Sequence, residues 1–204
     1  MQHFSAKALI LTTLLTLALG VGGVWADSPT DAVKGVIDQV VNILNDPALK
    51  AQKDRRRQMV KQTIDRRFDY EEMDKRSLEA NWKGLSAGQR QEFVKVFSEL
   101  LEASYADKIM KYAGEKVRYT GERKDADFAE VQTQLLRKND KIPMNYRLIE
   151  KSGNWMVYDV VIEGVSLVSN YRSQFGQVIR QNSFAELLKR MKTKISELKE
   201  TERG

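Results

Sequence analysis

Hydrophobic positions along the chain follow a helical spacing first, then alternate, and then return to a helical spacing. Apolar residues at i, i+3 and i+4 predict helices over residues 29–45, 47–68, 69–82 and 87–113. Asp69 with Glu72, and Ser86 with Gln89, form capping-box patterns that mark two of the helix starts. The N-terminal half is therefore expected to be helical.

From Val117 onward the apolar period drops to two, which is typical of half-buried strands. The alternation predicts four strands, around residues 117–119, 128–135, 142–148 and 155–162. Their connections, over residues 121–127, 139–140 and 152–154, are short and polar, so adjacent strands should run antiparallel. Helices, then four strands, then helices indicate an α+β fold, with a four-stranded antiparallel sheet and the helices from both chain ends packed on it.

The stretch from Asn154 to Ile179 joins the last strand to the next helix. Its strand is apolar on both alternating sets, with Trp155, Val157 and Val161 expected on one face and Val160 on the other. Such a strand requires cover on both faces, or cover on one and an apolar cavity on the other. Gly164 is expected to make a sharp bend from which the helix starts directly, and a last helix should follow Ser183.

The motif W-x-V-x-D, followed by E-G-V-S-L-V-x-N-Y-R-x-Q-F, carries a family resemblance. It resembles the closing motif of the MlaC-type (toluene-tolerance) periplasmic phospholipid-binding proteins. The likeness extends upstream through Phe68-Asp69, Leu78 with Trp82, and the aromatic stripe of residues 93–112, so it spans nearly all of residues 27–204.

The N-terminus has the pattern of a secretory signal: Lys7, an apolar run over residues 8–24, and small residues before a cleavage site after Ala26. We expect residues 1–26 to be a cleaved signal peptide and residues 27–204 to form a single lipid-binding domain in the periplasm. The alternative is an uncleaved membrane anchor, since residues 8–26 are just long enough to span a bilayer.

The amino-acid composition limits the kinds of catalytic and metal-binding site that the chain can form. The chain has no cysteine, and its one histidine, His3, lies in the expected signal. Thiol and histidine catalysis and thiolate or histidine metal sites are therefore not expected, and neither is a cofactor. The net charge of +6 is spread among many acids. It fits a solvated surface, or attraction to anionic headgroups or an acidic partner, better than a nucleic-acid-binding platform.

Asp159 is the candidate for catalysis, because a carboxylate near Tyr146 or Tyr158 on a cone-shaped α+β fold would suit an enzyme that uses an Asp base with a Tyr. Pairing with Arg147 on the neighbouring strand is the structural alternative and favours a non-enzyme. Glu163 is expected to cap the following helix. A third interpretation is an adaptor whose apolar faces bind another protein without any cavity.

The apolar faces predict more hydrophobic surface than a four-stranded sheet can cover, and a cavity between sheet and helices would use the excess. Burying a 16-carbon tail there is worth roughly 12 kcal/mol, at about 0.8 kcal/mol per methylene. From facing direction we expect a set of pocket-lining residues. These are Phe97, Leu101, Tyr105, Val131, Leu135, Met144, Tyr146, Val157, Leu167, Tyr171, Phe175 and Ile179.

The family resemblance implies the rest of the function. It implies a carrier that holds phospholipid tails between sheet and helices with the headgroup outside. Such a carrier shuttles between an inner-membrane ABC transporter with its substrate-collecting ring and an outer-membrane lipoprotein–porin complex. The implied role is to maintain outer-membrane lipid asymmetry, and a shuttle of this kind is most simply a monomer.

Overall fold

The computed structural model describes residues 28–201, so the expected signal peptide lies outside the described residues. The elements of the N-terminal half are α1 (Pro29–Asn45), η1 (Pro47–Leu49), α2 (Lys53–Asp65), α3 (Tyr70–Leu78), α4 (Ala80–Lys83) and α5 (Ala87–Met110). Side-chain caps start most of them: Ser28, Asp69 and Ser86 accept from backbone N–H groups of the first turns. The capping box of Ser86 and Gln89 is complete, as the sequence predicts.

The sheet is an antiparallel meander in the order β1-β2-β3-β4-β5. Its strands are β1 (Lys116–Asp125), β2 (Phe128–Leu136), β3 (Lys141–Lys151), β4 (Asn154–Ile162) and β5 (Val165–Ser166). Ser152 and Gly153, both at positive φ, form the tight turn between β3 and β4. The predicted α+β class and antiparallel order are confirmed, with a short fifth strand added.

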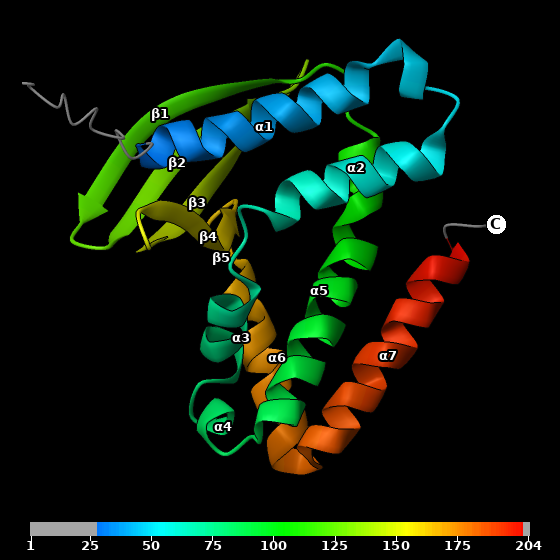
Figure 1. The fold of residues 1–204 in the computed structure, drawn as a ribbon, viewed down its shortest axis with the longest axis vertical. Helices are drawn as coiled ribbons and strands as arrows, with labels where there is room; N and C mark the ends of the chain where they lie inside the picture. The colour runs from blue at the N-terminus through cyan, green and yellow to red at the C-terminus, as the bar shows by residue number, and fades with distance from the viewer. Residues whose placement is uncertain (1–27, 202–204) are drawn as a thin grey trace, which may run out of the picture.

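The chain closes with α6 (Leu167–Gln181) and α7 (Phe184–Thr201). Figure 1 shows α1 lying along one face of the sheet, while α3, α5, α6 and α7 form a separate helical group beyond β4 and β5. α5 packs on α7, α3 and α2, and makes no extensive contact with the sheet. The helical group meets the sheet through α3 and α6, which pack on β4, and through the α1–α2 hairpin, in which α1 packs on the sheet and α2 on α5.

Three predicted boundaries are wrong. The second predicted helix is split into η1 and α2, although Asp46 caps η1 as expected by accepting from the Ala48 N–H. The third breaks at Glu79, whose φ of 48° ends α3 and sets α4 at an angle. The charged segment at residues 121–125 extends β1 instead of forming a loop. β1 is an edge strand, so it can carry charge on both faces.

A β-bulge in β4 changes which residues share a face. Val157 pairs with Leu148, Asp159 pairs with Arg147, and Tyr158 between them has no partner on β3. As a result Val157 and Val160 belong to one apolar cluster on the α1 side, whereas the sequence predicted opposite faces for them. The period-two rule fails here because the extra residue shifts the alternation by one position.

Asp74 in α3 is fully buried, and neither of its carboxylate oxygens has a hydrogen-bond partner among residues 28–201. Burial raises the pKa of Asp74 well above its usual value, and the nearby Glu71 and Asp69 raise it further. Below the unfolded-state pKa of about 4, the Asp74 carboxyl is protonated in both states and the fold has its full stability. As the pH rises toward and through the folded-state pKa, burial of this carboxyl lowers the free energy of unfolding. At neutral pH Asp74 therefore opposes folding.

We expect Asp74→Asn to raise the unfolding temperature by a few degrees at pH 8, and to bring no gain below about pH 4. The amide has the same shape and cannot ionise, so the gain should grow as the pH rises. Thermal unfolding followed by circular dichroism at several pH values measures this. Asp125→Asn, at an exposed aspartate, is the matched control. Parallel curves for wild type and Asp74→Asn across the pH range would contradict the expectation.

Candidate functional site

Two apolar clusters form the interior of the described protein. The helical cluster gathers side chains of α3 to α7 around Phe93, Phe97 and Phe175, whose rings meet at centroid distances of 5.2 to 5.8 Å. The sheet cluster joins Ala32 and Val33 of α1 to the facing residues of β2, β3 and β4. Phe68, just after α2, packs against both clusters. The candidate site is the region where the clusters approach each other.

Half-buried apolar and aromatic side chains line this region, which we call the apolar seam. Its members are Met144, Tyr146, Ile162 and Leu167 on the sheet side, and Leu101, Tyr105 and Tyr171 on the helical side. Leu167 lies one helical turn before Tyr171 on α6, and Leu101 lies one turn before Tyr105 on α5. These side chains are only half-buried, whereas the central residues of the two clusters are fully enclosed.

Tyr146 is a half-buried aromatic side chain on the sheet side of the seam. Burial raises the pKa of Tyr146 to about 12. Burial also raises the pKa of Tyr105 and Tyr171, so all three hydroxyls stay neutral at ordinary pH.

The β4–β5–α6 segment positions Leu167 and Tyr171. Glu163 and Gly164, both at positive φ, turn the chain, and Val165 and Ser166 return along β4 before α6 begins. Ser166 caps α6 by accepting from the Ser169 N–H. The predictions that Glu163 caps this helix and that the helix starts at Gly164 are therefore wrong. Ser166, three residues later in the E-G-V-S run, is the capping residue.

The predicted pocket residues fall into two groups. Phe97, Val131, Val157 and Phe175 are fully enclosed within the two clusters, with at most 4% of their surface exposed. The other predicted residues are half-buried: Leu101, Tyr105, Leu135, Met144, Tyr146, Leu167, Tyr171 and Ile179. Six of the half-buried residues belong to the seam, Leu135 lies toward the end of β2, and Ile179 packs against the helical cluster. Phe68 and Ile162 also border the seam but were not among the predicted residues.

Two surface hollows lie elsewhere. One, of about 600 Å³, lies between α5 and α7 beside Glu92 and Lys192. The other, of about 320 Å³, lies between the α3–α4 corner and α6 beside Glu79, Arg172 and Arg180. Neither contains any predicted pocket residue, and charged or polar side chains dominate both. The pocket assignment therefore remains a prediction that rests on the seam.

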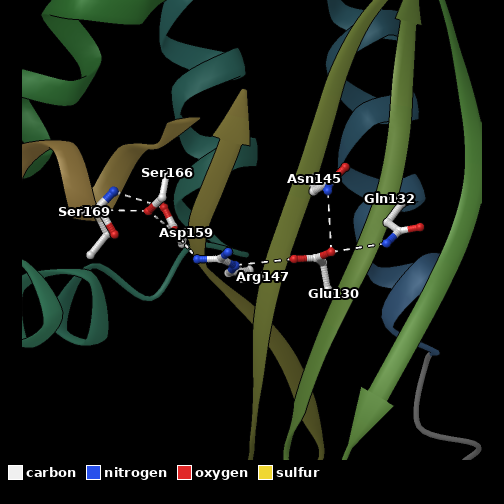
Figure 2. A network of polar contacts seen from close by, with 8 residues as sticks. Glu130, Gln132, Asn145, Arg147, Asp159, Ser166 and Ser169 are labelled. Atoms are coloured by element: carbon white, nitrogen blue, oxygen red, sulfur yellow. Dashed lines mark hydrogen bonds and ion pairs between the residues drawn. The ribbon is translucent and has the colours of Figure 1, made fainter. Parts of the chain in front are cut away.

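Asp159, the candidate for catalysis, has a structural role. Its carboxylate is 2% exposed and accepts from Arg147 at 3.1 Å, from the Ser166 hydroxyl at 2.6 Å and from the Val168 N–H at 3.0 Å. Arg147 also contacts Glu130 at 3.4 Å, which continues the network onto β2 (Figure 2). The predicted pairing with Arg147 is present. The Val168 N–H belongs to the first turn of α6, where a carboxylate is favoured by the helix dipole.

The network lies on the face of the sheet opposite the apolar seam. Figure 2 views this face, with α1 behind the strands. Tyr146 points to the other side, where it packs in the sheet cluster beneath α1. Asp159 and Tyr146 therefore cannot act on one substrate, and the geometry gives no support to that pair as catalytic groups.

Among residues 28–201, no cluster of three or more acidic side chains is placed to hold a metal ion. None of the helices in the same range combines the length and apolar character needed to cross a bilayer.

The MlaC protein family model matches residues 34–193, which include the apolar seam and the Asp159 network. The chain belongs to the MlaC family. This confirms the resemblance found in the closing motif. Because the match runs from the first turns of α1 to the middle of α7, the MlaC assignment applies to the sheet and to the helical group together.

Individual MlaC-like proteins support the assignment. The chain is 29% identical over 122 residues to the intermembrane phospholipid transport system binding protein MlaC of Haemophilus influenzae. That alignment spans 57% of this chain and 57% of the relative, so a little over half of each is compared. A solved structure of a phospholipid-binding protein from Ralstonia solanacearum in complex with a phospholipid is 26% identical, with a TM-score of 0.76. The match covers 84% of this chain and 99% of that chain.

We expect Asp159→Ala to lower the free energy of unfolding by about 3 kcal/mol, because it leaves Arg147 without its buried partner and two donors unsatisfied. Glu130→Ala removes the other, more exposed carboxylate from Arg147 and should cost less than about 1 kcal/mol. Urea unfolding measures both. Equal losses for the two variants would show that Asp159 does not hold the strand-to-helix junction.

Proposed function

We propose that this protein is a periplasmic phospholipid carrier that takes the acyl tails of its ligand into the apolar seam. The observation that carries the proposal is the likeness, over 84% of the chain, to a structure solved with a bound phospholipid. The seam supplies the chemistry. Half-buried apolar and aromatic side chains line it on both sides, and its hydroxyl groups are neutral.

The energetics favour a carrier over free exchange with water. Each buried methylene contributes about 0.8 kcal/mol, so a lipid with its tails in the seam would leave the protein very slowly through solvent. Release requires a partner that offers a continuous apolar path. We therefore propose that the protein shuttles between an inner-membrane ABC transporter with its substrate-collecting ring and an outer-membrane lipoprotein–porin complex, and so maintains outer-membrane lipid asymmetry.

The seam side chains also favour binding over turnover. Tyr105, Tyr146 and Tyr171 have raised pKa values, which makes each hydroxyl a poorer acid and keeps it from acting as a base at neutral pH. Asp159, the carboxylate considered for general-base chemistry, points to the other side of the sheet and is engaged by three donors. The arrangement can enclose an apolar ligand and orient its polar end.

The proposal predicts that Leu101→Trp greatly reduces co-purifying phospholipid, because the larger side chain fills space in the seam without introducing charge. Leu198→Trp makes the same exchange at a half-buried position of α7 that contacts only the helical cluster, and should leave the lipid in place. Organic extraction followed by mass spectrometry gives the molar ratio of lipid to protein, and circular dichroism verifies the fold.

Each outcome of this experiment has a distinct meaning. Wild-type protein without any lipid, before and after incubation with phospholipid vesicles, would favour an adaptor that binds other proteins through its apolar faces. A chemically altered lipid that accumulates over time would favour an enzyme. Full lipid occupancy in folded Leu101→Trp would place the tails outside the seam.

A further inference from the structure

The hollow between α6 and the corner where α3 meets α4 is lined by polar groups from both sides. Its volume is about 320 Å³. The corner contributes Ser77, Glu79 and Asn81, and α6 contributes Arg172, Gly176 and Arg180. None of these residues belongs to the apolar seam, so this hollow is separate from the proposed lipid site.

Arg172 reaches across the hollow and is ordered by the α3–α4 corner. Its Nε–H donates to the Arg76 carbonyl oxygen at 2.8 Å, and its Nη1 atom pairs with the Glu79 carboxylate at 3.0 Å. A guanidinium group carries five N–H donors, more than these two contacts use. Arg172 is therefore a fixed cation that can still bind a further acceptor.

Gly176 makes room for a second arginine. It lies one turn before Arg180 on the same face of α6, and helical side chains point back toward the N-terminus. A Cβ atom added at Gly176 would lie 3.0 Å from Nη1 of Arg180, closer than ordinary van der Waals contact. The Arg180 guanidinium therefore lies over Gly176, folded back toward Arg172. Among residues 28–201, Arg180 has no hydrogen bond or ion pair.

Glu79 shows that a carboxylate fits in this hollow. Its φ of 48° and ψ of −120° form a backbone conformation that favours glycine, and residues held in such conformations cluster at functional sites. At this position the glutamate carboxylate meets Arg172. Two arginines and one glutamate give the hollow a net charge of +1, so positive charge remains for a second carboxylate.

We propose that the hollow binds a carboxylate group between Arg172 and Arg180, over Gly176. A planar guanidinium matches a carboxylate because it offers two parallel N–H donors. One negative charge balances the net charge of the hollow, whereas Glu79 would repel a phosphate dianion. The carboxylate comes from a small free acid or from an acidic side chain of another protein, and the recognition chemistry is the same for both. This site does not depend on the proposed lipid-carrier function.

The test is a nuclear magnetic resonance titration at constant ionic strength, followed at the Nε–H signals of isotope-labelled arginine. Succinate represents a free acid, and a blocked tripeptide with a central glutamate represents a protein side chain. We expect saturable shifts of the Arg172 and Arg180 signals. Arg180→Gln should weaken binding by about tenfold, as expected for loss of a charge-assisted hydrogen bond. Glu79→Gln should tighten binding, because it removes the carboxylate that competes for Arg172.

Two matched controls separate the hollow from general effects of charge and helix stability. Arg190→Gln makes the same exchange at an exposed arginine of α7 that pairs with Glu186, and should leave binding unchanged. Gly176→Ala should weaken binding because the added methyl group displaces Arg180. Gly88→Ala adds a methyl group to a position of α5 with open space around it, and should have no effect.

Binding of one probe and not the other identifies the source of the carboxylate and supports the site. The proposal is overturned if neither probe binds wild type, or if Arg180→Gln and Arg190→Gln bind with equal affinity. A tripeptide with glutamine in place of glutamate that binds equally well also overturns it, and so does inorganic phosphate that binds more tightly than succinate. Co-purifying lipid should be the same in every variant, so the carrier function is tested separately.

Discussion

The buried carboxylate of Asp159 fixes the geometry on which the rest of the molecule depends. It receives one hydrogen bond from β3, one from β5 and one from the first turn of α6. Because all three donors converge on one group, the angle at which the chain leaves the sheet is set locally. That angle decides where Tyr171 and Phe175 meet α5. It therefore also decides how far the helical cluster stands from the sheet cluster.

Because the interior is divided into a helical cluster and a sheet cluster, the fold does not depend on a single core. Each cluster has its own fully buried residues: Phe93 and Phe97 among the helices, Val131 and Leu148 on the sheet. The seam between them is bridged mainly by half-buried side chains and by Phe68. Stability thus comes mainly from the two cores.

Much of the fold could be predicted from the sequence, because caps and apolar periods act locally. Ser86 with Gln89 fixed the start of the longest helix, and the turn at Ser152–Gly153 was marked by its residues. The wrong predictions have a common cause: they concern positions whose conformation depends on contacts between elements that are distant in the sequence. Nothing in the sequence marks Glu79 as a residue at positive φ, and the bulge at Tyr158 depends on pairing with β3. For the site, periodicity gives the direction of a side chain but not the distance to the opposing surface, so Phe97 and Tyr146 could not be separated into core and seam.

The outer edge of the sheet has a consequence for how copies of the protein behave at high concentration. β1 carries Lys116, Arg118, Arg123 and Lys124, and its register against β2 is interrupted between Tyr119 and Gly121. Charged side chains and a kink make it unfavourable for a second chain to add itself as a further strand. Within residues 28–201, the long outer edge of the sheet therefore carries features that oppose edge-to-edge association of copies.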